Sequence, residues 1–110
     1  MIDEEKMDSI LLELGFGEVL AGTGYLREAV RQYAGGRTQI TGEVYTAVAE
    51  VLNTTNTAVE RCIRHAIGRS LQRGNPDVIH KVFGWTLNVE TGVPTVGECI
   101  ARLARFCRAN

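Results

Sequence analysis

Apolar residues recur along the chain at spacings of three and four, the pattern that places them on one face of an α-helix. The first such segment runs from Asp3 to Leu14, stops at Gly15 and carries acidic residues on its other side. The second runs from about Thr23 to Ala34. We expect the run Gly22 to Gly24 to break the chain between these helices, and the pair Gly35-Gly36 to end the second helix in a left-handed cap.

A third segment is expected to begin at Thr41, whose hydroxyl is a candidate N-cap acceptor. Its apolar residues share one face and comprise Val44, Ala47, Val48, Val51 and Leu52. Asn53-Thr54-Thr55 interrupts the pattern, and a longer amphipathic helix follows from about Thr55 to Arg73. Its apolar stripe comprises Val59, Cys62, Ile63, Ala66, Ile67 and Leu71. A helix, a short turn and a longer helix make a helix-turn-helix pattern, although many helical hairpins share it.

Two weaker helices are predicted further on, from about Pro76 to Phe83 and from Thr95 to Cys107. Thr95 and Glu98 have the capping-box spacing, in which each side chain accepts from the other residue's backbone N–H. The segment from Gly84 to Val93 has some strand-like alternation, but it is short and isolated, so we expect a loop. The predicted fold class is all-α, with about six short helices containing a helix-turn-helix, in a single domain spanning residues 1–110.

The composition is that of an ordinary globular protein, with 110 residues, 45% hydrophobic and 23% charged. No apolar run approaches the roughly 18 residues of a membrane-spanning helix, and the acidic N-terminus is unlike a secretory signal. We therefore expect a cytoplasmic protein with no membrane partner. Cys62, Cys99 and Cys107 are widely spaced and form no CxxC pair, which favours small buried hydrophobic residues over a zinc or redox site.

Charge is distributed unevenly along the chain, although the formal net charge is only −1. Residues 1–20 hold six acidic residues and one lysine, a balance of −5, whereas residues 57–73 hold four arginines and one glutamate, a balance of +3. Exposed arginines are common on solvated helices, but there they usually have acidic partners four residues away, and Glu60–Arg64 is the single such pair here. Because charges act within about 8 Å at physiological salt, this basic face favours an anionic partner.

With the apolar stripe inward, the outward residues of this helix are Thr57, Glu60, Arg61, Arg64, His65 and Gly68. The DNA major groove admits a helix, arginine can bond guanine O6 and N7, and glutamate can accept from cytosine N4. Thr55, Asn56 and Thr57 at the helix start can donate to phosphates, together with free backbone N–H groups. Thr57 and Glu60 also have capping-box spacing, so Glu60 is either a cap or a base contact. The candidate DNA-binding residues are Thr55, Asn56, Thr57, Glu60, Arg61, Arg64, His65 and Arg69.

Several motifs resemble the effector-domain family of stage zero sporulation protein A, the response regulators that start endospore formation. The matching strings are Asn53-Thr54-Thr55, Val59-Glu60-Arg61, Ile63-Arg64-His65-Ala66-Ile67 and Arg73-Gly74-Asn75, supported by Gly24-Tyr25-Leu26-Arg27-Glu28-Ala29, Phe83-Gly84-Trp85-Thr86 and Pro94-Thr95. The resemblance covers about Asp8 to Phe106. It implies a six-helix domain whose third and fourth helices form the helix-turn-helix, and which binds double-stranded promoter DNA at boxes with a TGTCGAA-like core.

The resemblance also implies roles for individual residues and segments. Glu60 and Arg61 would face bases, while Arg64 and His65 would contribute to base or backbone contacts. The segment from Asn75 to Trp85 would contact the RNA polymerase sigma factor. The last helix would form the domain-to-domain contact of a homodimer or tandem arrangement on DNA.

Two departures from the family pattern bear on function. Ala58 stands where the family has a basic residue, so we expect one DNA contact to be missing. The α/β pattern and acidic pocket of the receiver domain that precedes this effector domain are not found in the sequence, so we expect either a fragment or a free-standing effector-like protein. The alternative function is a protein-interaction module that modulates a full-length sporulation regulator or RNA polymerase without strong DNA binding, which Ala58 and the acidic first helix favour.

No motif points to an enzyme, a metal site or a cofactor. His65 and His80 are far apart and have no cysteine or carboxylate at ligand spacing. The glycines between residues 15 and 24 fit neither a dinucleotide-binding nor a P-loop spacing. Ser9 and Ser70 lie inside helical segments, so no nucleophile elbow is present. We therefore expect a regulator rather than a catalyst.

Overall fold

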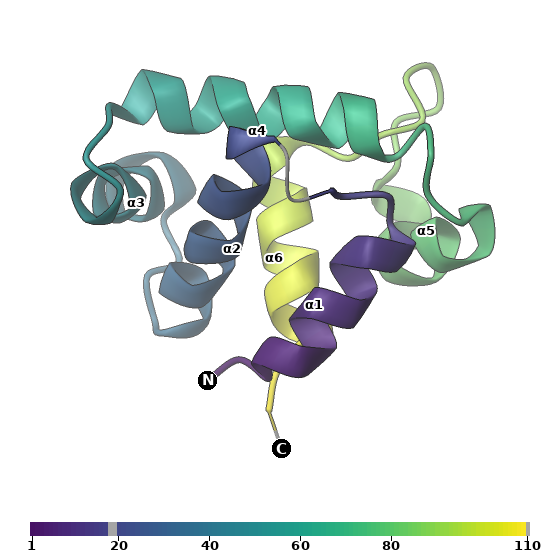
Figure 1. Ribbon diagram of the computed structural model, residues 1–110, viewed down its shortest axis with the longest axis horizontal. Helices are drawn as coiled ribbons and strands as arrows, with labels where there is room; N and C mark the ends of the chain where they lie inside the picture. Colours follow the sequence, from purple (N-terminus) through teal and green to yellow (C-terminus); the bar gives the residue numbers. More distant parts are fainter. Residues whose placement is uncertain (18–19, 110) are drawn as a thin grey trace.

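The described residues, 1–17 and 20–109 of a computed structural model, form six α-helices joined by short turns (Figure 1). The predicted all-α fold class is therefore confirmed. The elements are α1 (Glu4–Glu13), α2 (Ala21–Ala34), a π-helical turn η1 (Ile40–Val44), α3 (Tyr45–Val51), α4 (Asn56–Ser70), α5 (Pro76–Phe83), a 3₁₀ turn η2 (Gly84–Thr86) and α6 (Val96–Phe106). Within these residues, none of the helices has both the length and the apolar character needed to cross a bilayer.

Helices α2 and α6 occupy the centre of the molecule, and α4 lies across their N-terminal ends along one edge (Figure 1). Helices α3 and α5 lie toward the two ends of α4, and α1 packs at the other side of the centre. The core joins α2, α4 and α6 through fully buried apolar side chains, among them Leu26, Val30, Ile63, Ile100 and Leu103. Removal of such side chains from water is the main stabilising term of the fold, so α4 is held firmly along its inner side.

The two ends of the chain lie together at the side of the molecule remote from α4 (Figure 1). The Asp3 N–H donates to the Cys107 carbonyl at 2.8 Å, and the Ala109 N–H donates to the Met1 carbonyl at 3.0 Å. Ile2 and Arg108 form an isolated antiparallel bridge between these segments. The edge that carries α4 is therefore free of both termini.

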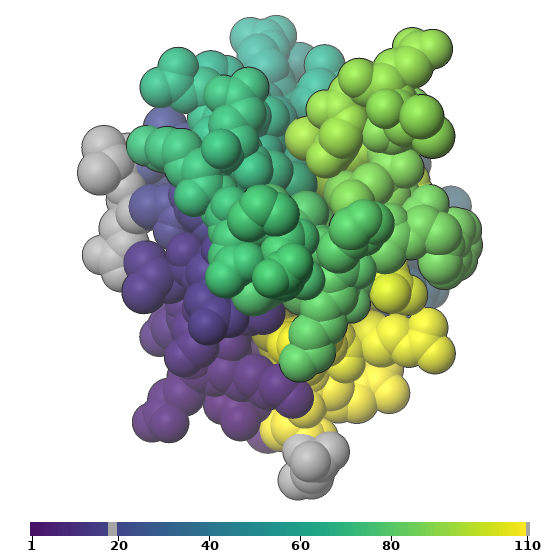
Figure 2. Space-filling model, turned by 90° about the vertical axis from the view of Figure 1, so that its right-hand side faces the viewer, coloured from purple at the N-terminus to yellow at the C-terminus, as the bar shows by residue number. Residues whose placement is uncertain are grey.

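Phe106 at the end of α6 lies beside α1 and α5. Figure 2 shows the face on which these three helices meet. The ammonium groups of Lys6 and Lys81 lie 5.3 and 5.9 Å from the centre of the Phe106 ring. Arg102 of α6 donates to the Val82 carbonyl of α5 at 3.0 Å. Cation–π contacts and this hydrogen bond fix α5 against the central pair of helices.

The expected chain break from Gly22 to Gly24 is wrong, because α2 begins at Ala21 and includes all three residues. The reason is the packing of α2 against α4. A Cβ atom on Gly22 would lie 2.0 Å from the Cys62 carbonyl oxygen, whereas one on Gly24 would meet nothing within 4 Å. Gly22 therefore allows the backbones of α2 and α4 to approach closely within a continuous helix.

The expected start of the third helix at Thr41 is also wrong. Thr41 lies inside the π-helical turn η1, where the Val44 N–H donates to the Gln39 carbonyl five residues back at 3.0 Å. The predicted apolar face is correct for its first part, but Val51 and Leu52 are 58% and 38% exposed. Val51 is the last residue of α3 and Leu52 its C-cap, so both lie at the C-terminal end of the helix.

Two helix ends follow the predicted chemistry, one of them with a change, and the Asn75 cap of α5 was not predicted. Gly36, just after α2, has a φ of +114° and supplies the expected left-handed residue. Asn75 caps α5 by accepting from the Asp77 N–H at 2.9 Å. Thr95 accepts from the Glu98 N–H at 3.1 Å, but the Glu98 carboxylate accepts from the Thr95 hydroxyl at 2.9 Å rather than from its backbone N–H. The pairing is real, although it is not the full capping box.

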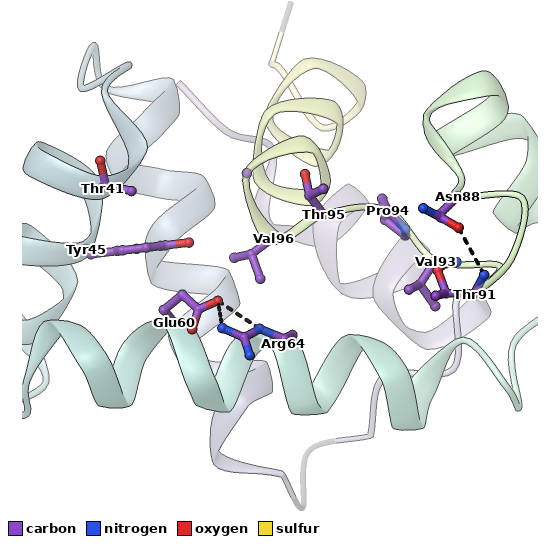
Figure 3. A pocket seen from close by; sticks show the side chains of 11 residues that line it. Thr41, Tyr45, Glu60, Arg64, Asn88, Thr91, Val93, Pro94, Thr95 and Val96 are labelled. Carbon is purple, nitrogen blue, oxygen red and sulfur yellow. Dashed lines mark hydrogen bonds and ion pairs between the residues drawn. The ribbon is translucent and has the colours of Figure 1, made fainter.

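The segment that follows α5 contains the short η2 turn and then an irregular loop, so the predicted loop is confirmed. The Asn88 side chain accepts from the Glu90 and Thr91 N–H groups at 2.8 and 3.1 Å, and this local turn replaces the pairing of a strand. The loop leads directly into α6 and brings Pro94 and Thr95 to the side of α4 (Figure 3).

Candidate nucleic-acid interface

The N-terminal end of α4 carries the three residues that the sequence singled out as phosphate contacts, and one of them, Asn56, ties it to α3. Thr55 is the N-cap, and its hydroxyl oxygen accepts from the Ala58 N–H at 3.1 Å. The Asn56 amide donates to the Thr46 hydroxyl of α3 at 2.9 Å. Thr55 retains its hydroxyl proton, and the first N–H groups of the helix have no partner within it. Thr57 is exposed. This end of α4 therefore offers donors to an anion.

The outward side of α4 is open to solvent along its length. Arg61, Arg64, His65 and Arg69 are all exposed, and Glu60 is half-buried. No segment of the described chain covers this side, because α4 forms the outer edge of the molecule (Figure 1). The side chains that the sequence predicted to face outward are therefore free to meet a partner.

Glu60 and Arg64 form an ion pair on α4. The Arg64 Nε donates to Glu60 Oε1 at 2.8 Å, and its Nη2 contacts the same oxygen. This hydrogen bond raises the pKa of Arg64 above its ordinary value. Glu60 caps no backbone group, because Thr55 is the N-cap, so the capping hypothesis for Glu60 is wrong. Within the described residues Arg61 and Arg69 form no ion pair.

The inward side of α4 explains why its outer face is rigid. Val59, Ile63, Ala66 and Ile67 are buried, as predicted, whereas Cys62 is only half-buried at the flank. A packed apolar face on a fifteen-residue helix fixes the rotation of that helix about its axis. The outward residues therefore keep one orientation relative to the rest of the fold.

Cys99 and Cys107 lie in the core, which agrees with their predicted role as small hydrophobic residues. Burial raises the pKa of the Cys99 thiol and raises that of Cys107 to about 11. Both thiols are thus protonated and weakly nucleophilic near neutral pH. Within the described residues no group of His, Cys, Asp and Glu side chains has the arrangement of a metal site.

A cleft of about 500 Å³ borders α4 on the side of α3 and α6 (Figure 3). Its walls are formed by Thr41, Tyr45, Glu60, Arg64, Asn88, Thr91, Val93, Pro94, Thr95, Val96 and Gly97. Tyr45 is only 7% exposed, and its hydroxyl points into the cleft (Figure 3). Burial, followed by the nearby Glu60 carboxylate, raises the pKa of Tyr45, and Arg64 opposes this. The phenol is therefore a neutral donor.

The opposite flank of α4 has a smaller and more apolar cavity of about 330 Å³. It lies between the start of α2 and the outer side of α4, and its lining comprises Leu20, Ala21, Gly22, Arg61, Cys62 and His65. The N-terminal ends of two helices thus border α4, α2 on one flank and α6 on the other. Helix N-termini carry partial positive charge, so both flanks reinforce the basic character of α4.

Sequence reasoning did not identify Tyr45 or Thr46 as part of this region. Both lie on α3 directly after the buried Val44, in a stretch that reads as a plain amphipathic helix. Their position beside α4 depends on the π-helical turn η1, which shifts the register of α3. No signal in the sequence predicted that turn.

The acidic residues of α1 are partly neutralised within the fold. Glu4 contacts Arg31 of α2 through two hydrogen bonds of 2.9 and 2.7 Å, and Asp8 pairs with Arg27 of the same helix. Glu18, counted in the acidic balance, lies outside the described residues. These two ion pairs, Glu4–Arg31 and Asp8–Arg27, form a clamp between α1 and α2.

Comparison with known families identifies the chain. The family model described as Sporulation initiation factor Spo0A C terminal matches residues 7–106, which is nearly the whole sequence. This family comprises DNA-binding effector domains of sporulation response regulators, and it is not a family of enzymes. The resemblance inferred from the motifs is confirmed, and the chain belongs to the Spo0A C-terminal family.

Proposed function

We propose that this chain is a sequence-specific DNA-binding transcription regulator, with α3, its following turn and α4 acting as a helix-turn-helix. Helix α4 would enter the major groove of promoter DNA, which presents a distinct donor and acceptor pattern for each base pair. The observation that carries this proposal is the exposed basic face of α4, centred on Arg61, in a chain of a DNA-binding family. DNA as partner implies a cytoplasmic location in a sporulating bacterium.

The candidate residues divide into two classes within this proposal. Arg61, which has no acidic partner in the described residues, reads a guanine, and His65 and Glu60 lie close enough along α4 to contact neighbouring bases. Thr55, Asn56 and Thr57 contact phosphate at the helix start, with Arg69 adding charge further along. The half-buried Ala58 adds no charge where a basic residue is usual in the family.

Fluorescence anisotropy with two duplexes of equal length tests the proposal. One duplex carries the TGTCGAA-like box and the other a scrambled box, and both are titrated at low and at physiological salt. We expect preference for the box at both salt concentrations, because base contacts persist when phosphate attraction is screened. Equal binding to the two duplexes at both salt concentrations would contradict the proposal.

A second candidate function is protein interaction, which one observation favours. Trp85 and Val89, just after α5, are 85% and 100% exposed, on a segment that projects from the molecule (Figure 2). Exposed aromatic residues are enriched where proteins bind one another. The segment from Asn75 to Trp85 is thus a candidate contact for RNA polymerase sigma factor. If the chain shows no box preference but binds polymerase through Trp85, the interaction module is the better description.

A further inference from the structure

Tyr45 presents a polar group that its own fold does not use. The side chain is 7% exposed, and its hydroxyl forms no hydrogen bond within the described residues although it opens into the cleft beside α4 (Figure 3). Within the described residues the buried side-chain oxygens without a partner are those of Thr23 and Ser70, so the Tyr45 hydroxyl is accessible from the cleft and free to donate outward. An external acceptor would satisfy it.

Two further sets of donors line the same cleft. The α6 helix begins there, and the Val96 and Gly97 N–H groups have no partner within the helix, whereas the Glu98 N–H is taken by Thr95. Arg64 uses Nε and Nη2 for Glu60, so its Nη1 remains available. A phenol, a helix N-terminus and a guanidinium are all groups that donate hydrogen bonds to anions.

The two carboxylates near this site are each held by a partner. Glu60 accepts from Arg64 and thereby orients that guanidinium beside the cleft (Figure 3). Glu98 accepts from the Thr95 hydroxyl at 2.9 Å and is not part of the cleft lining. Each carboxylate uses one oxygen, Oε1, for these contacts, so Glu60 Oε2 has no hydrogen bond within the described residues at the cleft wall, and Arg64 Nη1 is the free cationic group beside it.

The dimensions of a helix and of the DNA major groove indicate which anion would lie at this cleft. A helix with its side chains is about 10–12 Å wide and the major groove is about 12 Å wide, so structures bordering the helix come against the sugar–phosphate backbones. The cleft borders α4 at the level of Arg64 and is open to solvent (Figure 3).

We propose that this cleft binds one backbone phosphate of the DNA strand beside α4, with the Tyr45 hydroxyl and the first N–H groups of α6 as donors and Arg64 as the cation. This inference rests on the proposed function and adds Tyr45 and the start of α6 to the interface. It also gives Glu60 the role of positioning Arg64.

Methylphosphonate substitution of the box duplex, one phosphate at a time, tests this inference against wild type and Tyr45→Phe. For wild type we expect roughly tenfold weaker binding at one phosphate flanking the box, the cost of a lost hydrogen bond to a charged group. Tyr45→Phe should bind the unmodified duplex several-fold more weakly and lose less than wild type at that same position. Tyr33→Phe, on the last turn of α2, is the matched control and should behave as wild type.

Urea unfolding accompanies these titrations, because the Tyr45 hydroxyl bonds nothing within the described fold and its removal should leave the unfolding midpoint unchanged. Wild-type affinity in Tyr45→Phe, or equal losses for both proteins at every modified phosphate, would overturn the inference. The inference would also be overturned if inorganic phosphate shifted the NMR resonance of the Gly97 amide while none of the modified duplexes bound more weakly than the unmodified one. Failure of the proposed function is a separate result, namely equal wild-type binding to box and scrambled duplexes.

Discussion

Arg61 and Arg64 lie one helical turn apart on α4 but have different surroundings. Arg64 is held by Glu60, which restricts its guanidinium to one flank of the helix. Arg61 has no ion pair within the described residues and is exposed. A two-pronged contact with guanine needs two free donors on one guanidinium, so we propose Arg61 as the base-reading residue and Arg64 as a phosphate contact.

Arg61→Ala is expected to weaken binding to the box duplex by about 1–3 kcal/mol and to reduce the preference over the scrambled duplex. Anisotropy titrations at one fixed salt concentration measure both quantities. Arg37→Ala is the control. It removes an exposed arginine whose side chain donates to Gln32, and it should leave the affinity and the preference for the box unchanged. Equal losses on box and scrambled duplexes for Arg61→Ala would contradict a base-reading role.

Arg64→Ala is expected to weaken binding to both duplexes by similar factors. Loss of one phosphate contact should reduce the slope of log affinity against log salt concentration by about 0.9. Titration at four or five salt concentrations gives this slope directly. A variant with an unchanged slope and a lost box preference would instead make Arg64 a base contact.

At the scale of the element, the close approach of α2 and α4 holds the basic helix α4 against the core. Gly22→Ala places a Cβ 2.0 Å from a carbonyl oxygen of α4, so backbone must shift and we expect destabilisation by about 2–3 kcal/mol. Gly24→Ala, in the same helix with open space around it, should instead stabilise by up to about 1 kcal/mol. Urea unfolding of both variants checks the contrast, and equal effects of the two changes would rule out the packing argument.

The clamp between α1 and α2 predicts a pH dependence of stability. The Arg31 guanidinium, hydrogen-bonded to Glu4, holds the pKa of that carboxyl below its ordinary value of 4.5. The resulting stabilisation is present above pH 4.5 and is lost as the pH falls through the lower pKa of the folded state. The side chains are exposed, so the effect should stay below about 1 kcal/mol.

Glu4→Gln should therefore lower the urea midpoint at pH 7, and the difference from wild type should shrink toward pH 3. Glu5→Gln changes a neighbouring exposed carboxylate that forms no ion pair within the described residues. At pH 7 the urea midpoint of Glu5→Gln should therefore differ less from that of wild type than the midpoint of Glu4→Gln does. A Glu4→Gln difference that grows on acidification would have the wrong sign for this clamp.

At the scale of the whole molecule, the length of the domain can be compared with the length of one turn of DNA. The structure extends 34 × 31 × 25 Å, close to one turn of the double helix, which is about 34–36 Å long. Two domains can therefore lie side by side on boxes about one turn apart. In the proposed binding mode a single α4 would contact few phosphates and bases, so we expect a lone domain to bind weakly.

A duplex with two boxes one helical turn apart is expected to bind the chain more tightly than a duplex with one box. Insertion of about five base pairs between the boxes rotates the second site to the other side of the helix and should remove the gain. Anisotropy with the three duplexes measures this difference. Identical affinity per box on all three would argue for binding as independent single domains.

Most of the architecture was predictable because the signals are local. The stripe from Val59 to Leu71, the Thr95–Glu98 pairing and the start of α5 at Pro76 all depend on neighbours within one or two turns. The same local period placed Arg61, Arg64 and His65 on the outward side of α4. Prediction failed at Gly22 and Thr41, where the deciding contacts come from distant residues or from an inserted π-helical turn.

By itself, the sequence determined that the chain forms amphipathic helices and that one of them carries arginines opposite its apolar stripe, because periodicity and charge are properties of consecutive residues. Only the tertiary structure decided that Gly22 serves the contact between α2 and α4, and that Tyr45 and the start of α6 share a cleft with α4. Those relations join residues far apart in the chain, and packing alone brings them together.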